Sequence, residues 1–224
     1  MPQPDDAVPL SHAALKTKQR LLPDRFPVSL SLRTHRALSW LQRAEQETND
    51  DDVRFILLWI GFNAAYAADL RTYQQGERVV FADYFRALID LDAEGRIQAL
   101  IWDRFSREIG LLLENKYVFA PFWSHHNGVT GYDDWERRLA ESQAVSRRAL
   151  ARRDTCTVLS VVFDRLYVLR NQLMHGGATW NSRVNRDQVH DGADVLGWLL
   201  PVFIDIMLDH DQRDWGPPYY PNLP

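Results

Sequence analysis

The chain has 224 residues, of which 46% are hydrophobic and 25% charged, a composition typical of a folded globular protein rather than a disordered one. Its net charge of −4 excludes nucleic-acid binding through bulk positive charge, so any contact with RNA requires a local basic patch. No run of about 18 apolar residues occurs, and residues 1–9 are polar and acidic. We therefore expect neither a membrane span nor a secretion signal.

The single cysteine, Cys156, has no partner for an internal disulfide and excludes a cysteine-based zinc site. This usage fits a reducing compartment, so the expected location is cytoplasmic. We expect no metal site and no cofactor.

Residues 1–31 contain five prolines and predict an extended N-terminal arm with one short helix over residues 11–20. The folded body is expected to span residues 32–210. Apolar residues at helical spacing predict its first helix over residues 32–47, with Ser31 as N-cap. Aspartates at positions 50–52 then precede an almost wholly apolar helix, which we expect to be buried on most sides. That helix is predicted over residues 53–70.

Three shorter helices are expected next, at residues 81–90, 94–104 and 106–116. An aromatic loop over residues 117–131 follows and contains His125 and His126. Adjacent histidines in a loop point apart, and no Cys or Glu stands at zinc-binding spacing nearby. We interpret these two histidines as solvated loop residues.

The second half predicts a charged amphipathic helix over residues 132–153, an apolar helix over 155–174, a loop over 180–186 and a long helix over 187–209. Pro201 predicts a kink in the last of these helices. A proline-rich tail occupies residues 211–224. Because no strand-like alternation of any length occurs, the sequence predicts an all-α protein.

The apolar helix over residues 155–174 ends in an unusual polar cluster: Arg170 and Asn171, then His175, Gly176 and Gly177. Glycine accepts the left-handed conformation that ends helices, so His175 should lie in or just past the last turn. At ~100° per residue, Arg170 and His175 lie about 140° apart on an ideal helix. A shared site therefore requires a bend near Gly176 and a contribution from a second chain.

This Arg-Asn-x-x-x-His segment resembles the signature of HEPN domains, an all-helical family. The resemblance implies a HEPN-like helical bundle with additional helices, and a homodimer with the motif helices side by side. It also implies metal-independent RNA cleavage, in which His175 acts as acid or base, Arg170 clamps the phosphate and Asn171 orients the motif. HEPN toxins tend to carry a tyrosine two residues after the histidine, where this chain has Gly177.

Other polar residues are candidates for supporting this site. Asn63 is the strong polar group on the apolar helix over residues 53–70 and must find partners there, for which Arg170 or Asn171 is the expected choice. Ten arginines and seven acidic residues lie between residues 133 and 190. From this locally basic segment we select the candidate RNA-binding residues Arg148, Arg152 and Arg165, although alternating charges are equally typical of a solvated helix face.

The resemblance thus implies an endoribonuclease with RNA as substrate, in a toxin–antitoxin or antiviral defence setting, with an antitoxin or regulatory protein as a further partner. Three alternatives stay open. The polar cluster is also typical of a simple helix C-cap. The other two are a HEPN fold that dimerises or binds RNA without cleaving it, and a helical protein that binds a nucleotide or a partner protein without cleavage.

Overall fold

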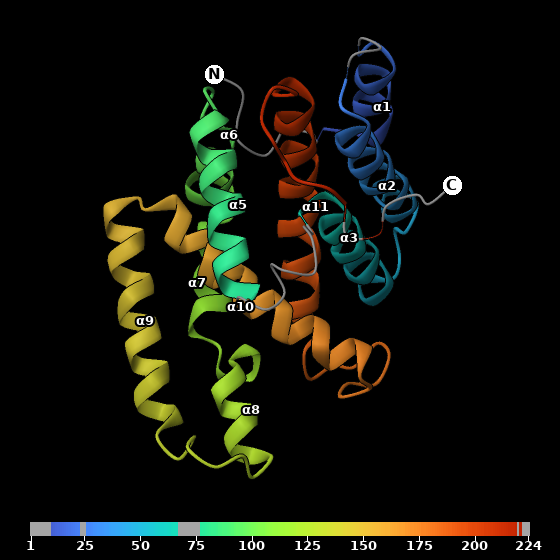
Figure 1. Ribbon diagram of the computed structural model, residues 1–224. Coiled ribbons are helices and arrows are strands. Elements are labelled where there is room, and N and C mark those ends of the chain that lie inside the picture. Colours follow the sequence, from blue (N-terminus) through green and yellow to red (C-terminus); the bar gives the residue numbers. More distant parts are fainter. Residues whose placement is uncertain (1–9, 23–25, 67–76, 219, 221–224) are drawn as a thin grey trace.

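The computed structural model describes residues 10–22, 26–66, 77–218 and 220 (Figure 1). Within these ranges every regular element is helical and no strand occurs, so the predicted all-α class is confirmed. Among the same residues, no helix combines the length and the apolar character needed to cross a membrane.

Helix α1 (His12–Arg20) is the short helix expected in the N-terminal arm, but it is part of the folded body. Ser11 caps it by accepting a hydrogen bond from the backbone N–H of Ala14 at 3.3 Å. Leu15 is only 1% exposed and belongs to the core, where α1 contacts α2 and α11. The predicted boundary between arm and body near residue 32 therefore comes too late in the chain, because α1 buries apolar surface against later helices.

Helix α2 (Val28–Glu45) begins four residues earlier than predicted, after Pro27, and Ser31 lies inside its first turn rather than at its N-cap. Helix α3 (Asp51–Tyr66) follows. Asp50 caps α3 by accepting from the N–H of Val53 at 3.1 Å, as the aspartates at this position predict. The predicted end of α3 at residue 70 lies outside the described residues.

Four helical segments then follow in short succession: α5 (Glu77–Leu91), α6 (Arg96–Ala99), a π-helical turn (Leu100–Arg104) and α7 (Ser106–Glu114). The predicted loop over residues 117–131 is wrong in part. It contains a 3₁₀ turn (Lys116–Val118) and helix α8 (Ala120–His126). A proline near the start of α8 is compatible with a helix because the first-turn N–H groups need no intrahelical partner.

The last three helices are α9 (Trp135–Arg152), α10 (Thr155–Met174) and α11 (Arg186–Asp209). The bounds of α10 are those predicted, and those of α11 differ by one residue at its start. In Figure 1, α9 stands at one edge of the molecule and α10 passes behind α5 toward the opposite edge. The motif therefore lies at the end of α10 that points away from α9.

The core is an aromatic cluster formed by α3, α5, α10 and α11. Phe163 of α10 lies 4.5 Å from Phe62 of α3 and 4.7 Å from Phe85 of α5, measured between ring centroids. Phe203 of α11 lies 6.3 Å from Phe163, and all four rings are 0% exposed. Because bulky rings in a close-packed interior permit little rotation of a helix, this cluster fixes which face of α10 points outward at its C-terminal end.

A partly buried ion-pair network joins helices that are distant in sequence. Asp205 of α11 accepts from Lys18 of α1 at 2.6 Å and from Arg96 of α6 at 2.5 Å. Burial of the carboxylate acts to raise the pKa of Asp205, but the hydrogen bonds and charges of Lys18 and Arg96 outweigh it and hold the pKa below its ordinary value. The network holds α1 on the body of the protein.

The C-terminal tail is held by Arg33 of α2, which is 1% exposed. Its guanidinium donates to the carbonyl of Ala65, in the last turn of α3, at 2.9 Å and to the carbonyl of Pro217 at 2.8 Å. Burial lowers the pKa of Arg33. Trp215 completes the attachment, because its ring packs 6.1 Å from that of Tyr84.

Candidate active site at the end of helix α10

Helix α10 remains regular up to the histidine of the motif and turns sharply after it. The N–H of His175 donates to the carbonyl of Asn171 at 3.0 Å, which is an ordinary α-helical bond. Gly176 then adopts a φ of +69°. The N–H of Gly177 donates to Gln172 at 2.8 Å and the N–H of Gly176 to Leu173 at 3.4 Å, which together form a Schellman motif. The predicted glycine-based helix end is confirmed.

Because the bend comes after His175, it does not bring this side chain toward Arg170. His175 is exposed, whereas Arg170 is half-buried. Arg170 Nη1 donates to Oδ1 of the adjacent Asn171 at 2.9 Å, and this bond holds the guanidinium beside the helix. The two side chains thus keep the divergence of about 140° that a regular helix imposes. Among the described residues, no hydrogen bond joins the side chains of Arg170 and His175.

Replacing Gly176 by alanine should lower the free energy of unfolding by about 1 kcal/mol, because an L side chain is strained in the left-handed conformation. Chemical denaturation would measure this change. Gly110→Ala is a matched control: Gly110 lies inside α7, and a Cβ there meets no atom within 4 Å. That substitution should be neutral or stabilising by up to about 1 kcal/mol. Equal effects at the two positions would contradict the geometry.

Asn63 does not pair with the motif. It is half-buried on α3, and among the described residues no hydrogen bond joins it to Arg170 or Asn171. The predicted partnership is therefore wrong. Arg170 already has Asn171 as a neighbour on the same helix, a pairing that needs no contribution from α3.

The three arginines selected for RNA binding do not form one surface with the motif. Arg165 is 2% exposed, lies 4.5 Å from the centre of the Phe119 ring and donates to Ser142 at 2.9 Å. Its predicted contact with RNA is wrong, because its guanidinium is enclosed between α10, α9 and the segment before α8. A buried arginine in this position joins helices.

Arg148 and Arg152 are exposed on α9, and neither forms an ion pair with another described residue. However, they lie next to the first turn of α10, whereas His175 lies past its last turn. A helix of 20 residues is about 30 Å long at ~1.5 Å per residue. These arginines and the motif of the same chain are therefore at opposite ends of α10.

The loop after the motif is anchored by three consecutive aspartates at the start of α3. Asp50 accepts from the indole N–H of Trp180 at 2.6 Å, and Asp52 accepts from Arg186 Nη2 at 2.7 Å. Asp51 accepts from His190 at 2.9 Å. Sequence reasoning interpreted these aspartates only as helix caps, because nothing local in the sequence indicates partners about 130 positions away.

These contacts shift the pKa values of His190 and Asp50, among others. The hydrogen bond to Asp51 raises the pKa of His190 against the opposing effect of burial. Burial acts to raise the pKa of Asp50, but the hydrogen bonds from Trp180 and Val53 hold it below its ordinary value. Both shifts favour the charged forms, which strengthen these hydrogen bonds.

Several side chains around the motif remain on the surface. Met174, Trp180 and Val184 are 49%, 74% and 89% exposed, respectively. Arg183 is also exposed, and no ion pair to it occurs among the described residues. The end of α10 and its following loop thus present apolar groups and two cationic or protonatable groups, His175 and Arg183, to solvent.

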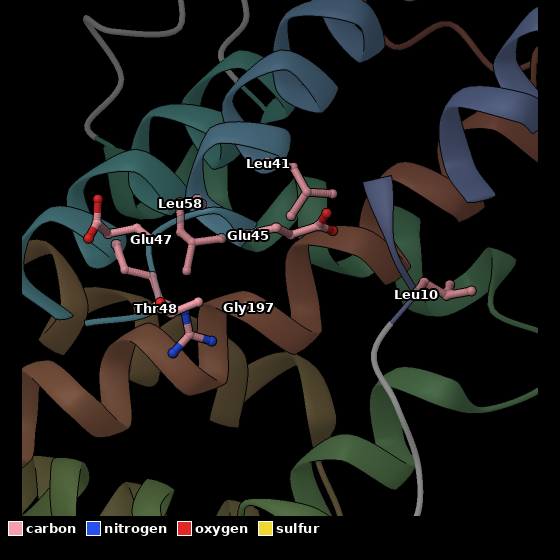
Figure 2. A pocket seen from close by; sticks show the side chains of 9 residues that line it. Leu10, Leu41, Glu45, Glu47, Thr48, Leu58 and Gly197 are labelled. Atoms are coloured by element: carbon pink, nitrogen blue, oxygen red, sulfur yellow. The ribbon is translucent and has the colours of Figure 1, made fainter. Parts of the chain in front are cut away.

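A separate pocket of about 350 Å³ lies between α2, α3 and α11 (Figure 2). Leu41 and Leu58 line its apolar part, and Glu45, Glu47 and Arg54 its polar part. These three charged groups already have partners, namely the N–H of His12, Arg43 and Asp194. None of the residues that line the pocket comes from α10, so it is not part of the motif site.

His125 and His126 end α8 instead of lying in a loop. The His126 ring lies 4.1 Å from that of Phe122, and its Nδ1 lies 2.8 Å from the Phe122 carbonyl oxygen. In the part of the chain that the structure describes, no group of three or more His, Cys, Asp or Glu side chains is arranged to hold a metal ion.

Comparison of the chain with protein-family models, with curated proteins and with solved structures finds no match.

Proposed function

We propose that this protein is a metal-independent endoribonuclease of the HEPN type, with an active site completed by two chains. The observation that carries the proposal is the position of Arg170, Asn171 and His175 at the exposed end of α10, where a glycine turn stops the helix. His175 lies in solvent, so its imidazole is accessible to a ligand.

We propose a dimer because Arg170 and His175 of one chain point in different directions on the helix. Two motif helices that meet side by side would place the arginine of one chain near the histidine of the other. Exposed Met174 beside the motif supports a contact at this point, because apolar side chains at a helix end are favourable when a second chain covers them.

In the proposed reaction the 2′-hydroxyl oxygen attacks the adjacent phosphorus, and the bond from phosphorus to the 5′-oxygen breaks. One His175 accepts the proton of the 2′-hydroxyl group, and the second His175 donates a proton to the departing 5′-oxygen. Arg170 stabilises the additional negative charge on the phosphorane. The products are a 2′,3′-cyclic phosphate and a free 5′-hydroxyl group.

Cleavage of a short single-stranded RNA by the purified protein in excess EDTA tests the reaction. We expect fragments with 2′,3′-cyclic phosphate and 5′-hydroxyl ends, identified by mass spectrometry. The same RNA with 2′-O-methyl groups is the control and should stay intact, since it lacks the attacking hydroxyl. Intact unmodified RNA, or fragments with 3′-hydroxyl and 5′-phosphate ends, would overturn the proposal.

A second candidate function is a HEPN-fold module that dimerises or binds RNA or a nucleotide without cleavage. The specific observation in its favour is that Arg170 and His175 of one chain do not converge. For either function we propose a cytoplasmic location. For the nuclease we also propose a toxin–antitoxin or antiviral defence setting, with an antitoxin or regulatory protein as partner.

A further inference from the structure

Trp180 lies in the loop that follows the motif, and its indole is hydrogen-bonded to Asp50 although most of the side chain is exposed. It is 74% exposed, although tryptophan is among the most favourable side chains to bury. Its indole N–H donates to Asp50 Oδ2 at 2.6 Å, and the other oxygen of Asp50 is fixed by the N–H of Val53. The polar edge of the indole is therefore occupied, while much of the ring surface faces solvent.

The residue after Trp180 is fixed as well. The N–H of Asn181 donates to Asp52 at 2.7 Å, and Arg186 donates both to Asp52 and to Oδ1 of Asn181. Asn181 adopts a φ of +55°, a conformation that its short polar side chain tolerates. The exposed indole is thus pre-organised, which lowers the entropic cost of binding a ligand against it.

Trp180 lies within reach of the motif. Four residues lie between it and His175, so their Cα atoms are at most about 18 Å apart, the length of a fully extended chain. The turn at Gly177 and the bond from the N–H of Ala178 to Gln172 at 3.2 Å shorten this distance by folding the loop back on the helix end. Arg183, on the same loop, adds an exposed cation without an acidic partner among the described residues.

We propose that Trp180 stacks on an unpaired RNA base and that Arg183 contacts a phosphate of the same strand, so that this loop positions single-stranded RNA at His175. This inference rests on the proposed function. An aromatic face with a cation beside it is the usual arrangement for binding single strands, because every base offers a π-face and every nucleotide a phosphate. A fixed, exposed indole with an exposed arginine three positions later in the same loop fits a nucleotide better than it fits an apolar protein surface.

Binding of a fluorescein-labelled single-stranded RNA of mixed sequence to the His175→Ala protein tests the inference, because this variant should bind without cutting. Trp180→Leu in that background should weaken binding by about 5- to 100-fold, the effect of losing one base stack. Trp180→Phe should retain most of the affinity. Arg183→Ala should lower the slope of log affinity against log salt concentration by about one, because one fewer ion is released on binding.

Trp40→Leu is the matched control, since Trp40 is a partly exposed tryptophan on α2 that is absent from the motif and its loop. It should leave RNA affinity unchanged.

Sedimentation of each variant completes the experiment. RNA affinity that is the same in Trp180→Leu and its parent overturns the inference while leaving the proposed nuclease intact. Loss of a dimer in Trp180→Leu also overturns it and assigns the indole to a second chain. Absence of RNA binding in the parent overturns both proposals.

Discussion

Replacing His175 by alanine should lower the rate of RNA cleavage by about 10²- to 10⁴-fold, the usual effect of losing a general acid or base. The protein should remain folded, because His175 is exposed and substitutions at such positions change stability by only about 0.5 kcal/mol. Single-turnover kinetics with a short RNA would measure the rate, and circular dichroism would confirm the fold.

His210→Ala is the matched control for this prediction. His210 is the C-cap of α11, just as His175 is the C-cap of α10, so both substitutions remove an imidazole from a helix end. Only His175 lies in the motif. If His210→Ala lowers the rate as much as His175→Ala, the loss reflects a helix cap and not catalysis.

Mixing two inactive variants tests whether two chains form the site. Arg170→Ala retains His175, and His175→Ala retains Arg170, so a mixed dimer holds one copy of each group in its shared cleft. We expect the mixture to cleave RNA faster than either variant alone but more slowly than wild type, because its cleft holds one Arg170 and only one of the two His175 side chains that the reaction uses. Because Arg170 and His175 of one chain diverge, persistent inactivity of an exchanging mixture would contradict the composite site.

The second large effect concerns stability and its pH dependence. Asp205→Asn should lower the free energy of unfolding at pH 7 by about 2–3 kcal/mol, because Lys18 and Arg96 each lose one carboxylate partner, although they keep Asp209 and Asp92, respectively. We place the effect below the usual range for buried pairs because Lys18 and Arg96 are 31% and 28% exposed and regain some hydration. Urea denaturation would measure this difference.

The difference between wild type and Asp205→Asn should disappear in acid. The pKa of Asp205 is lowered in the folded protein, so its contribution is present above the unfolded value of about 3.9. That contribution is lost as the pH falls through the lower folded value. Asp83→Asn is the control: Asp83 forms an exposed pair with Arg86, and its loss should cost at most about 0.5 kcal/mol at any pH. A difference that does not shrink as the pH falls below about 3.9 would contradict the assignment.

Local patterns in the sequence were sufficient to predict the bounds of long helices with a clear apolar face and a clear stop. The apolar run and the Gly-Gly stop defined α10 to the residue, and the final helix was displaced by one position. Helix α8 was missed because only seven residues form it, and its aromatic side chains pack on neighbours that a local pattern does not reveal. Likewise, the start of α2 was missed because Pro27, not the expected serine, precedes it.

For the candidate site too, the sequence predicted the local features and missed those that depend on packing. The sequence alone placed Arg170, Asn171 and His175 at the end of α10 and determined their angular separation, since a regular helix sets both. It did not show that Arg165 is buried, that Asn63 stands apart from the motif or that Arg148 lies at the far end of α10. Those facts depend on how whole helices pack.

What the sequence by itself determined is the all-α class and a motif at the end of an apolar helix, because hydrogen bonding and hydrophobic periodicity act over a few residues. Only the tertiary structure decided which of these side chains reach solvent and which loop lies beside them. Asp50 and Trp180 are 130 positions apart, and their bond exists because α3 and α10 pack around one aromatic core. Such pairings follow from the close packing of the whole chain, which short-range patterns do not encode.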